Sequence, residues 1–418
     1  MGNARQIGGG IHQLEVHHVE RWLLKLPFGH LGEQLLQQGY SVDFVSDDLL
    51  RKLTVDKQGQ LKSGSATYRV LLIPRATYIP EATLELIGKL AQQGVRVVFA
   101  DQLPRQAPGF FQHQDRSAKV QQQGRMLRQL RTVWISSDVT KTLDSLGVRS
   151  EQMATVGLSF IRKRKADTTL FFVTNLGNRF QKGWVALSAS GKATRYDALT
   201  NQYQSLAQRT LQAAKNEVFL QIEPGQSCFI SVVNSNVPAT KSVEPIQTEE
   251  TIAQLTGPWQ LQFSKGKPAL STTHTLPALA SWTTLSDSAS YFSGKAHYVT
   301  TFDVPGTTDI TRPYTLDLGD VREVADVTLN GQPLGTAWCI PFQLTIPPGR
   351  LRHGTNRLEI DVTNLSANYM RLYDRQNPGW KKFYDINIVD IRYQPFDASK
   401  WDVMPSGLLG PVRIRKRF

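Results

Sequence analysis

The apolar residues of this chain follow one pattern up to about residue 153 and a different pattern beyond it. In the first part, short apolar runs alternate with segments whose apolar residues recur every three or four positions, which is typical of strand, helix and strand in turn. In the second part, short apolar runs are separated by turn residues at regular intervals. Strand–helix–strand order favours a parallel sheet, whereas closely spaced strands favour antiparallel sheets. The sequence therefore predicts a multidomain protein that combines an α/β part with all-β parts.

Residues 37–150 carry the α/β pattern. A helix is predicted to begin at Pro80 and Glu81, because proline is tolerated in the first turn, and to end at Gly94. The apolar positions on its buried face are Leu84, Ile87, Leu90 and Ala91. The predicted strands around it lie at 68–73, 95–100 and 132–135. We expect a small doubly wound, flavodoxin-like α/β domain.

The loop after residue 73 of this domain reads Pro-Arg-Ala-Thr-Tyr and contains no glycine. A phosphate group needs glycine at such a turn, because only then does it approach the backbone closely. A nucleotide or flavin site is therefore not expected, and no cofactor is predicted. The adjacent Asp47 and Asp48 precede a short predicted helix, and we interpret them as capping residues and not as catalytic carboxylates.

The remaining chain is predicted to be all-β. Residues 151–236 contain six short apolar runs separated by turns, which is typical of a small antiparallel β-sandwich. Residues 237–251 are rich in Ser, Thr, Pro and Glu without periodicity and are interpreted as a linker. Residues 252–418 return to short strands. Within them, Asn330-Gly331 between apolar runs predicts a tight hairpin, since both turn positions need a positive φ.

Charge and cysteine content exclude several classes of function. The net charge is +13, but Lys and Arg are scattered along the chain, so we predict no nucleic-acid partner. The densest run, residues 162–165, abuts strand residues and is interpreted as a solvated strand face. No apolar run approaches the roughly 20 residues of a membrane span. Cys228 and Cys339 are each expected to be buried thiols inside strands, and no metal site is predicted.

Several motifs resemble one enzyme family. They are Gly257-Pro258-Trp259, Trp282, Asp287, Tyr291-Phe292-Ser293-Gly294, Ala296, Tyr298 and the closing segment 405–412. Together with segments 39–45, 172–175 and 196–200 in the same order, they resemble the C-terminal part of family 106 α-L-rhamnosidase-like glycoside hydrolases. Residues 298–412 also resemble the sugar-binding β-sandwich of family 2 glycoside hydrolases. This second resemblance implies that 252–418 is a galactose-binding-like jelly roll.

The resemblance has consequences for function. Members of the family carry a catalytic (β/α)-barrel before this region, whereas residues 1–36 match the family poorly and are too few for a barrel. We therefore expect no catalytic residue and interpret the chain as a fragment. Its expected role is to brace or extend the substrate site of a barrel supplied in cis or in trans, with a rhamnose-containing glycan as partner. A periplasmic or secreted location is implied by the family alone. The alternative is a stand-alone carbohydrate-binding protein.

The stretch from residue 373 to residue 402 combines acidic and aromatic side chains. They are Asp385, Asp390, Asp397 and Asp402 together with Tyr373, Trp380, Phe383, Tyr384, Tyr393, Phe396 and Trp401. Aromatic faces pack on the apolar side of sugar rings, and carboxylates accept hydrogen bonds from hydroxyl groups. The predicted carbohydrate-binding residues are Asp397, Trp401, Tyr373 and Trp380 in this stretch, and Trp338 outside it.

The family 2 resemblance supports one of these residues in particular. In that family an acidic residue shortly before the closing tryptophan lies near the neighbouring active site, and Asp397 occupies the matching place before Trp401. The alternative is that the stretch is an insertion that forms its own small cluster or packs on the barrel.

Other aromatic residues admit the same two interpretations. Trp282, Tyr291, Phe292 and Trp338 are either a binding platform or part of a core, and core packing is favoured for each. Asn364, at the end of a predicted strand, is expected to make at most a loop contact.

Overall fold

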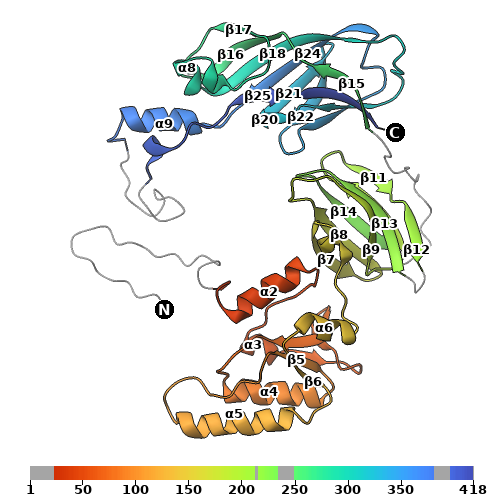
Figure 1. Ribbon diagram of the computed structural model, residues 1–418, viewed down its shortest axis with the longest axis vertical. Helices are drawn as coiled ribbons and strands as arrows, with labels where there is room; N and C mark the ends of the chain where they lie inside the picture. Colours follow the sequence, from red (N-terminus) through yellow and green to blue (C-terminus); the bar gives the residue numbers. More distant parts are fainter. Residues whose placement is uncertain (1–22, 212–214, 234–248, 381–395, 418) are drawn as a thin grey trace.

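The computed structural model describes residues 23–211, 215–233, 249–380 and 396–417. Most of its helices lie in the N-terminal part, and strands make up most of the remainder (Figure 1). The protein is thus mixed α/β, with a parallel sheet of three strands and several antiparallel sheets. None of the sheets formed by these residues closes into a barrel.

The N-terminal part, residues 27–155, is called here the α/β unit. Its helices are α2 (Pro27–Gln37), α3 (Asp47–Leu50), α4 (Glu81–Gln92), α5 (His113–Leu127), α6 (Val139–Ser145) and α7 (Gln152–Thr155). Its strands are β1 (Thr54–Val55), β2 (Leu61–Ser63), β3 (Ala66–Tyr68), β4 (Val70–Ile73), β5 (Arg96–Ala100) and β6 (Val133–Ser136). Strands β4, β5 and β6 are parallel, with Val97 opposite Leu71 on one side and Val133 on the other. The predicted parallel strand at 95–100 is confirmed.

Helix α4 follows its sequence prediction closely. It begins at Glu81 after Pro80, and its buried residues include all four predicted apolar positions. Gly94 has a φ of +99°, a value that an L side chain rarely adopts, so the helix does not continue past it. A bidentate ion pair from Arg116 of α5 to Glu81 then holds the two helices together, at 2.7 Å and 3.0 Å.

The expected capping by the aspartate pair is wrong in its detail. The N-cap of α3 is Ser46, whose side chain accepts a hydrogen bond from the Leu49 amide. Asp47 instead accepts a hydrogen bond from the Thr83 hydroxyl at 2.8 Å, and Asp48 pairs with Arg51 on the surface. Both aspartates are structural, as expected.

Residues 159–233 are called here the first β unit. Its strands are β7 (Ser159–Lys165), β8 (Thr168–Thr174), β9 (Gln181–Leu187), β10 (Lys192–Asp197), β11 (Gln202–Ser205), β12 (Gln208–Leu211), β13 (Lys215–Ile222) and β14 (Ser227–Val233). They form a five-stranded sheet in the order β11-β10-β14-β8-β7 and a three-stranded sheet in the order β12-β13-β9. Inward residues of both sheets, such as Phe171 and Val218, share one hydrophobic core.

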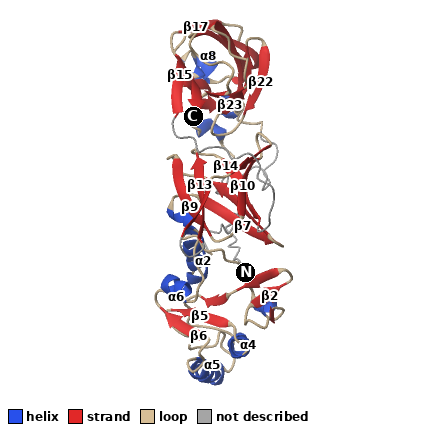
Figure 2. Ribbon diagram, turned by 90° about the vertical axis from the view of Figure 1, so that its right-hand side faces the viewer, coloured by secondary structure: helices blue, strands red, loops and turns tan. Residues whose placement is uncertain are grey.

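Residues 249–417 are called here the second β unit (Figure 2). Its strands are β15 (Glu249–Leu255), β16 (Trp259–Lys267), β17 (Thr273–Leu276), β18 (Ser293–Val304), β19 (Tyr314–Asp317), β20 (Asp320–Arg322), β21 (Val324–Leu329), β22 (Gln332–Ala337), β23 (Gln343–Ile346), β24 (Gly354–Thr363), β25 (Gly407–Gly410) and β26 (Val412–Arg417). Its short helices are η1 (Trp282–Thr284), α8 (Asp287–Ser290) and η3 (Ala398–Lys400), and α9 (Ala367–Gln376) is longer.

Two main sheets build this unit. Six strands run in the order β17-β16-β18-β24-β21-β22, and four run in the order β15-β26-β19-β23. Strand β15 begins inside the segment 237–251 that was predicted to be a linker, because residues 249–255 pair with β26. The predicted hairpin is confirmed: Asn330 and Gly331 have φ values of +53° and +76° and join β21 to β22.

The two cysteines differ in their surroundings. Cys228 is buried in β14, as predicted. Cys339 is only partly buried and lies in a bend beyond the end of β22, so its predicted place inside a strand is wrong. Strand β22 ends at Ala337, and the bend that contains Cys339 leads to Pro341.

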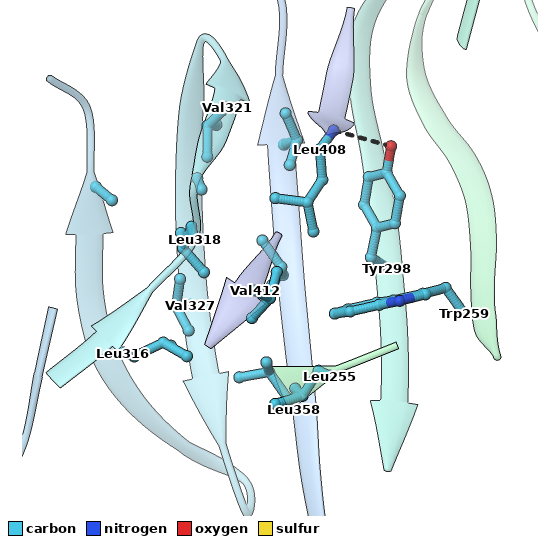
Figure 3. Packing of buried hydrophobic residues seen from close by; sticks show 14 of the residues in the cluster. Leu255, Trp259, Tyr298, Leu316, Leu318, Val321, Val327, Leu358, Leu408 and Val412 are labelled. Carbon is cyan, nitrogen blue, oxygen red and sulfur yellow. Dashed lines mark hydrogen bonds between the residues drawn. The ribbon is translucent and has the colours of Figure 1, made fainter. Parts of the chain in front are cut away.

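The Tyr298 hydroxyl is a buried polar group in the core of the second β unit (Figure 3). It accepts hydrogen bonds from the Trp282 indole at 2.5 Å and from the Leu408 amide at 3.1 Å. Burial raises the pKa of Tyr298 to about 12. A Cβ at Gly407 would lie 2.4 Å from the Trp282 indole nitrogen, so only glycine fits there. The core interpretation of Trp282 and Phe292 is confirmed, since both are at most 1% exposed.

Tyr298→Phe is expected to destabilise the second β unit by about 2 to 5 kcal/mol, because it leaves two buried donors without an acceptor. Urea denaturation of the variant measures the loss. The matched control is Tyr314→Phe, which removes only the donor that binds the Asp309 carbonyl. Equal losses for the two variants would contradict the role given to Tyr298.

Glu81→Gln is expected to lower the unfolding temperature of the α/β unit in a pH-dependent way. Hydrogen bonding from Arg116 lowers the pKa of Glu81 from 4.5 to about 2. The ion pair therefore stabilises the fold fully above the unfolded-state pKa, and this stability is lost as the pH falls through the folded-state pKa. Circular dichroism melts of both proteins should show a difference that shrinks between pH 4.5 and about pH 2. A difference that stays constant across this window would exclude the mechanism.

Candidate functional site

Helix α9 and the segment that returns from it carry the predicted site. Four ring contacts join five aromatic residues: Tyr369 to Tyr373 at 6.2 Å, Tyr373 to Trp380 at 5.8 Å, Trp380 to Phe396 at 6.1 Å, and Phe396 to Trp401 at 5.4 Å between centroids. Tyr369 and Tyr373 are four residues apart in α9 and therefore lie on one face of the helix. We call these five residues the aromatic cluster. The structure thus brings together Tyr373, Trp380 and Trp401, three of the residues predicted from the sequence.

Asp374 is a buried residue that connects the segments carrying the aromatic cluster. It is only 4% exposed. One carboxylate oxygen accepts a hydrogen bond from the Trp380 indole at 2.7 Å, and the other accepts from the amides of Ala398 at 2.8 Å and Ser399 at 3.1 Å. Asp374 therefore ties α9, the following turn and η3 to one point. Asp374 was not among the residues predicted from the sequence, although its position one residue after Tyr373 placed it in the acidic and aromatic stretch.

A second polar network fastens α9 to the β-sheets. The Asn364 side chain accepts a hydrogen bond from the Gly294 amide at 2.9 Å and donates to the Phe292 carbonyl at 2.8 Å. Asn368 exchanges two hydrogen bonds with the backbone of Met404, each at 2.8 Å. Both asparagines also donate to the Ser406 hydroxyl. The expectation that Asn364 makes at most a loop contact is wrong, because it links the start of β18, the residue just before that strand and the closing segment.

Two arginines of α9 hold the returning chain in place. Arg371 donates to the Trp401 carbonyl at 2.7 Å, and Arg375 donates to the Ser399 carbonyl at 2.7 Å. These contacts hold the backbone of Trp401, and the residue remains 41% exposed. Tyr373 is 37% exposed, and Met404 is 42% exposed. The outer side of the cluster is thus an apolar, aromatic surface on a rigid polar support.

Asp397 lies beside this surface, but its side chain contacts residues of η3. Its side chain accepts a hydrogen bond from the Ser399 amide at 3.1 Å and pairs with Lys400 at 3.2 Å. Hydrogen bonds from Ser399 and Lys400 lower the pKa of Asp397. A lowered pKa keeps the carboxylate ionised at neutral pH, which suits an acceptor for sugar hydroxyls and does not suit a general acid.

Trp338 occupies a different place. It is 60% exposed in the bend after β22, so the favoured interpretation as a core residue is wrong for it. Within the described part of the chain, no ring contact joins it to the aromatic cluster. The strand that follows, β23, contacts the first β unit, since its first residue, Gln343, donates a hydrogen bond to Glu223 at 2.6 Å. Trp338 therefore lies near the contact between the two β units.

Of the remaining members of the stretch, Asp402 is exposed, and five lie outside the described residues: Phe383, Tyr384, Asp385, Asp390 and Tyr393. Across the ranges that the structure describes, no group of three His, Cys, Asp or Glu residues could hold a metal ion. In the same ranges no helix is both long and apolar enough to cross a membrane.

Comparison with known proteins relates the chain to one family of enzymes. Glycoside hydrolase family 106, α-L-rhamnosidase, matches residues 29–206. The rhamnosidase structure from Novosphingobium sp. PP1Y is similar over 89% of this chain, with a TM-score of 0.66 and 24% identity. A protein of Formosa agariphila called a putative β-glucuronidase is 34% identical over 178 residues, which is 38% of this chain. The resemblance to family 106 is confirmed.

The matches cover only part of the related proteins. This chain spans 36% of the Novosphingobium rhamnosidase and 15% of the Formosa protein. A family 2 β-galacturonidase from Eisenbergiella tayi matches 30% of this chain with a TM-score of 0.23, which is too low to carry an argument. The family match also ends well before the aromatic cluster.

Asp374→Asn is expected to destabilise the second β unit by about 2 to 4 kcal/mol, because an amide nitrogen cannot accept the hydrogen bonds that one carboxylate oxygen accepts. Urea unfolding followed by near-ultraviolet circular dichroism measures the change. Asp397→Asn, which loses only a local cap and a surface ion pair, is the control and should cost less. A loss at Asp374 no larger than at Asp397 would show that Asp374 is not the anchor.

Proposed function

We propose that this chain, which contains a region of the family 106 α-L-rhamnosidases, is a non-catalytic accessory part of a glycoside hydrolase. In this proposal it braces or extends the substrate site of a catalytic barrel that is supplied in cis or in trans. Residues 37–150 would be a flavodoxin-like domain, 151–236 a small β-sandwich and 252–418 a galactose-binding-like jelly roll. The substrate class would be a polysaccharide that contains L-rhamnose or a similar sugar.

The state of the carboxylates in the candidate site supports a role without catalysis. Glycoside hydrolysis needs two carboxyl groups on either side of one bond, and one of them must be held protonated. The pKa of Asp397 is lowered, and the Asp397 side chain contacts residues of the short helix η3. Asp374 is buried beneath the rings and accepts three hydrogen bonds. Neither residue has the environment of a general acid.

The observation that carries the proposal is the exposed side of the aromatic cluster. Tyr373 and Trp401 expose more than a third of their surface, while Asp374, Arg371 and Arg375 fix the segments that bear them. When a sugar ring packs on an aromatic side chain that is already held in place, little free energy of binding is lost in ordering the protein. Asp397 is close enough along the chain to accept hydrogen bonds from the same sugar.

The same exposed rings also favour the alternative, a stand-alone carbohydrate-binding protein. The two functions differ in what the chain does by itself. A stand-alone module binds glycan with micromolar affinity without any other protein, whereas a bracing part binds only in the presence of the barrel.

The purified chain is expected to release no nitrophenol from a panel of nitrophenyl glycosides that includes the α-L-rhamnoside. Hydrolysis that is abolished by substituting one of its own carboxylates would overturn the proposal. Calorimetry with a rhamnose-containing oligosaccharide, with and without the barrel of a family member, then separates the two functions.

In whichever setting binding occurs, Trp401→Ala should weaken it about tenfold or more, which is about 1.4 kcal/mol. Trp338→Ala is the matched control, since it also removes an exposed tryptophan. Equal effects of the two variants would exclude the aromatic cluster as the binding surface.

A further inference from the structure

The five-stranded sheet of the first β unit carries a row of large apolar side chains on the face that points away from its core. Each strand contributes one residue, and the row reads Tyr203 (β11), Tyr196 (β10), Phe229 (β14), Phe172 (β8) and Ile161 (β7). Residues directly opposite each other in an antiparallel pair point to the same face, so the register itself assembles this outer row.

The burial pattern shows that the outer row faces away from the core. Phe171 and Val173, the neighbours of Phe172 in β8, are fully buried in the core of the unit. At the two ends of the row, Tyr203 is 68% exposed and Ile161 is 69% exposed. A solvent-facing sheet surface usually alternates with polar residues, so five apolar residues in one register line form an unusual surface.

The rings of the outer row contact one another. Tyr196 and Tyr203 stack at 4.5 Å between centroids with an interplanar angle of 27°, and Phe172 and Phe229 lie 5.1 Å apart with their planes tilted by 49°. Two rings that both lay flat on the sheet would overlap at such distances, so at least one ring of each pair is raised from the sheet and turns an edge outward. The edge of an aromatic ring is the positive end of its quadrupole. The ridge therefore favours contact with negatively charged oxygen atoms.

The neighbouring register line on the same face is polar. It consists of Lys163 (β7), Leu170 (β8), Ser231 (β14), Thr194 (β10) and Ser205 (β11). Lys165 lies one step further along β7, opposite Thr168, and both lysines are exposed. The intervening Arg162 points to the other side, where it pairs with the buried Glu151 at 2.7 Å. Neither register line contains an acidic residue, so this face carries cations and hydroxyl groups beside a ridge of ring edges.

We propose that this face binds an anionic polysaccharide. Lys163 and Lys165 pair with its carboxylate or sulfate groups, the hydroxyl groups of the adjacent line hydrogen-bond to its sugar hydroxyls, and the ridge packs along the chain. Charge complementarity carries this assignment, in line with the net charge of +13. The site lies on a different β unit from the aromatic cluster, so it goes beyond the proposed function and does not depend on it.

Two other kinds of partner fit this face less well. Single-stranded nucleic acid binds by stacking its bases on open ring faces, whereas here Tyr196 lies against Tyr203 and Phe172 lies against Phe229. The centre of a protein–protein interface is depleted in lysine, whereas lysines border the ridge here. Both partners remain outcomes of the experiment.

The test uses the full chain and affinity electrophoresis in gels that contain polygalacturonate, dextran sulfate or neutral dextran. We expect retardation by at least one of the two anionic polymers and none by dextran. Which anionic polymer retards the chain tells carboxylate from sulfate recognition. The double variant Lys163→Gln/Lys165→Gln should weaken the binding about tenfold. A charge-matched double variant, Arg125→Gln/Arg128→Gln, changes two exposed arginines at the C-terminal end and C-cap of α5 and should alter the binding less than about twofold.

An aromatic variant tests the ridge. Tyr203→Ala should weaken binding to the anionic polymer, and Tyr78→Ala should not, although Tyr78 is an exposed tyrosine of similar accessibility at 57%. Equal weakening by the two charge variants would show that net charge alone drives binding and would overturn the site. Equal retardation by polydeoxythymidine, or an unaffected Tyr203→Ala, would overturn the glycan assignment. Trp401→Ala should leave this binding unchanged, so failure here is distinguishable from failure of the proposed function.

Discussion

The segment that leads into helix α9 and the segment that returns from the aromatic cluster meet at Ser406. Hydrogen bonds to buried polar groups hold the chain there. The Ser406 hydroxyl accepts hydrogen bonds from the side chains of Asn364 and Asn368, and the Ser406 carbonyl accepts a hydrogen bond from the Trp282 amide at 3.0 Å. Two residues later, the Leu408 amide donates to the Tyr298 hydroxyl. These groups are buried or nearly so, and an unsatisfied buried donor or acceptor costs about 1 to 3 kcal/mol. The segment therefore has one favourable position, and the placement of α9 and the aromatic cluster depends on it.

Some of this architecture could be predicted from the sequence, because local chemistry decides it. Helix α4 follows from a period of 3.6 residues between a proline and a glycine, and the β21–β22 hairpin follows from an Asn-Gly pair. Asn364 and Asp374 could not be assigned in this way, because their partners lie far along the chain at Gly294 and Ala398. Cys339 illustrates the opposite error: it was predicted to lie inside a strand, and it lies in a bend that leads to Pro341.

Two aspartates in the same stretch show why residue type alone does not identify a catalytic site. Asp374 is buried and accepts three hydrogen bonds, from the Trp380 indole and from the amides of Ala398 and Ser399. Asp397 is partly exposed and accepts from its own short helix, which lowers its pKa. The sequence favoured Asp397 because of its spacing to Trp401, and spacing carries no information on which carboxylate is desolvated. Only the fold distinguishes the buried Asp374 from the partly exposed Asp397, which a ligand can reach.

The two surfaces that we assign to carbohydrate differ in how they present aromatic rings. In the aromatic cluster the rings follow a helix and a return segment, so successive rings meet at large angles and the outermost ones keep accessible surface. In the outer row the strand spacing of the sheet, about 4.8 Å, places neighbouring rings against one another, so that ring edges are turned outward. A neutral sugar gains most from an open ring face, whereas an anion gains from ring edges and lysines. Secondary structure thus decides which kind of sugar each set of aromatic residues suits.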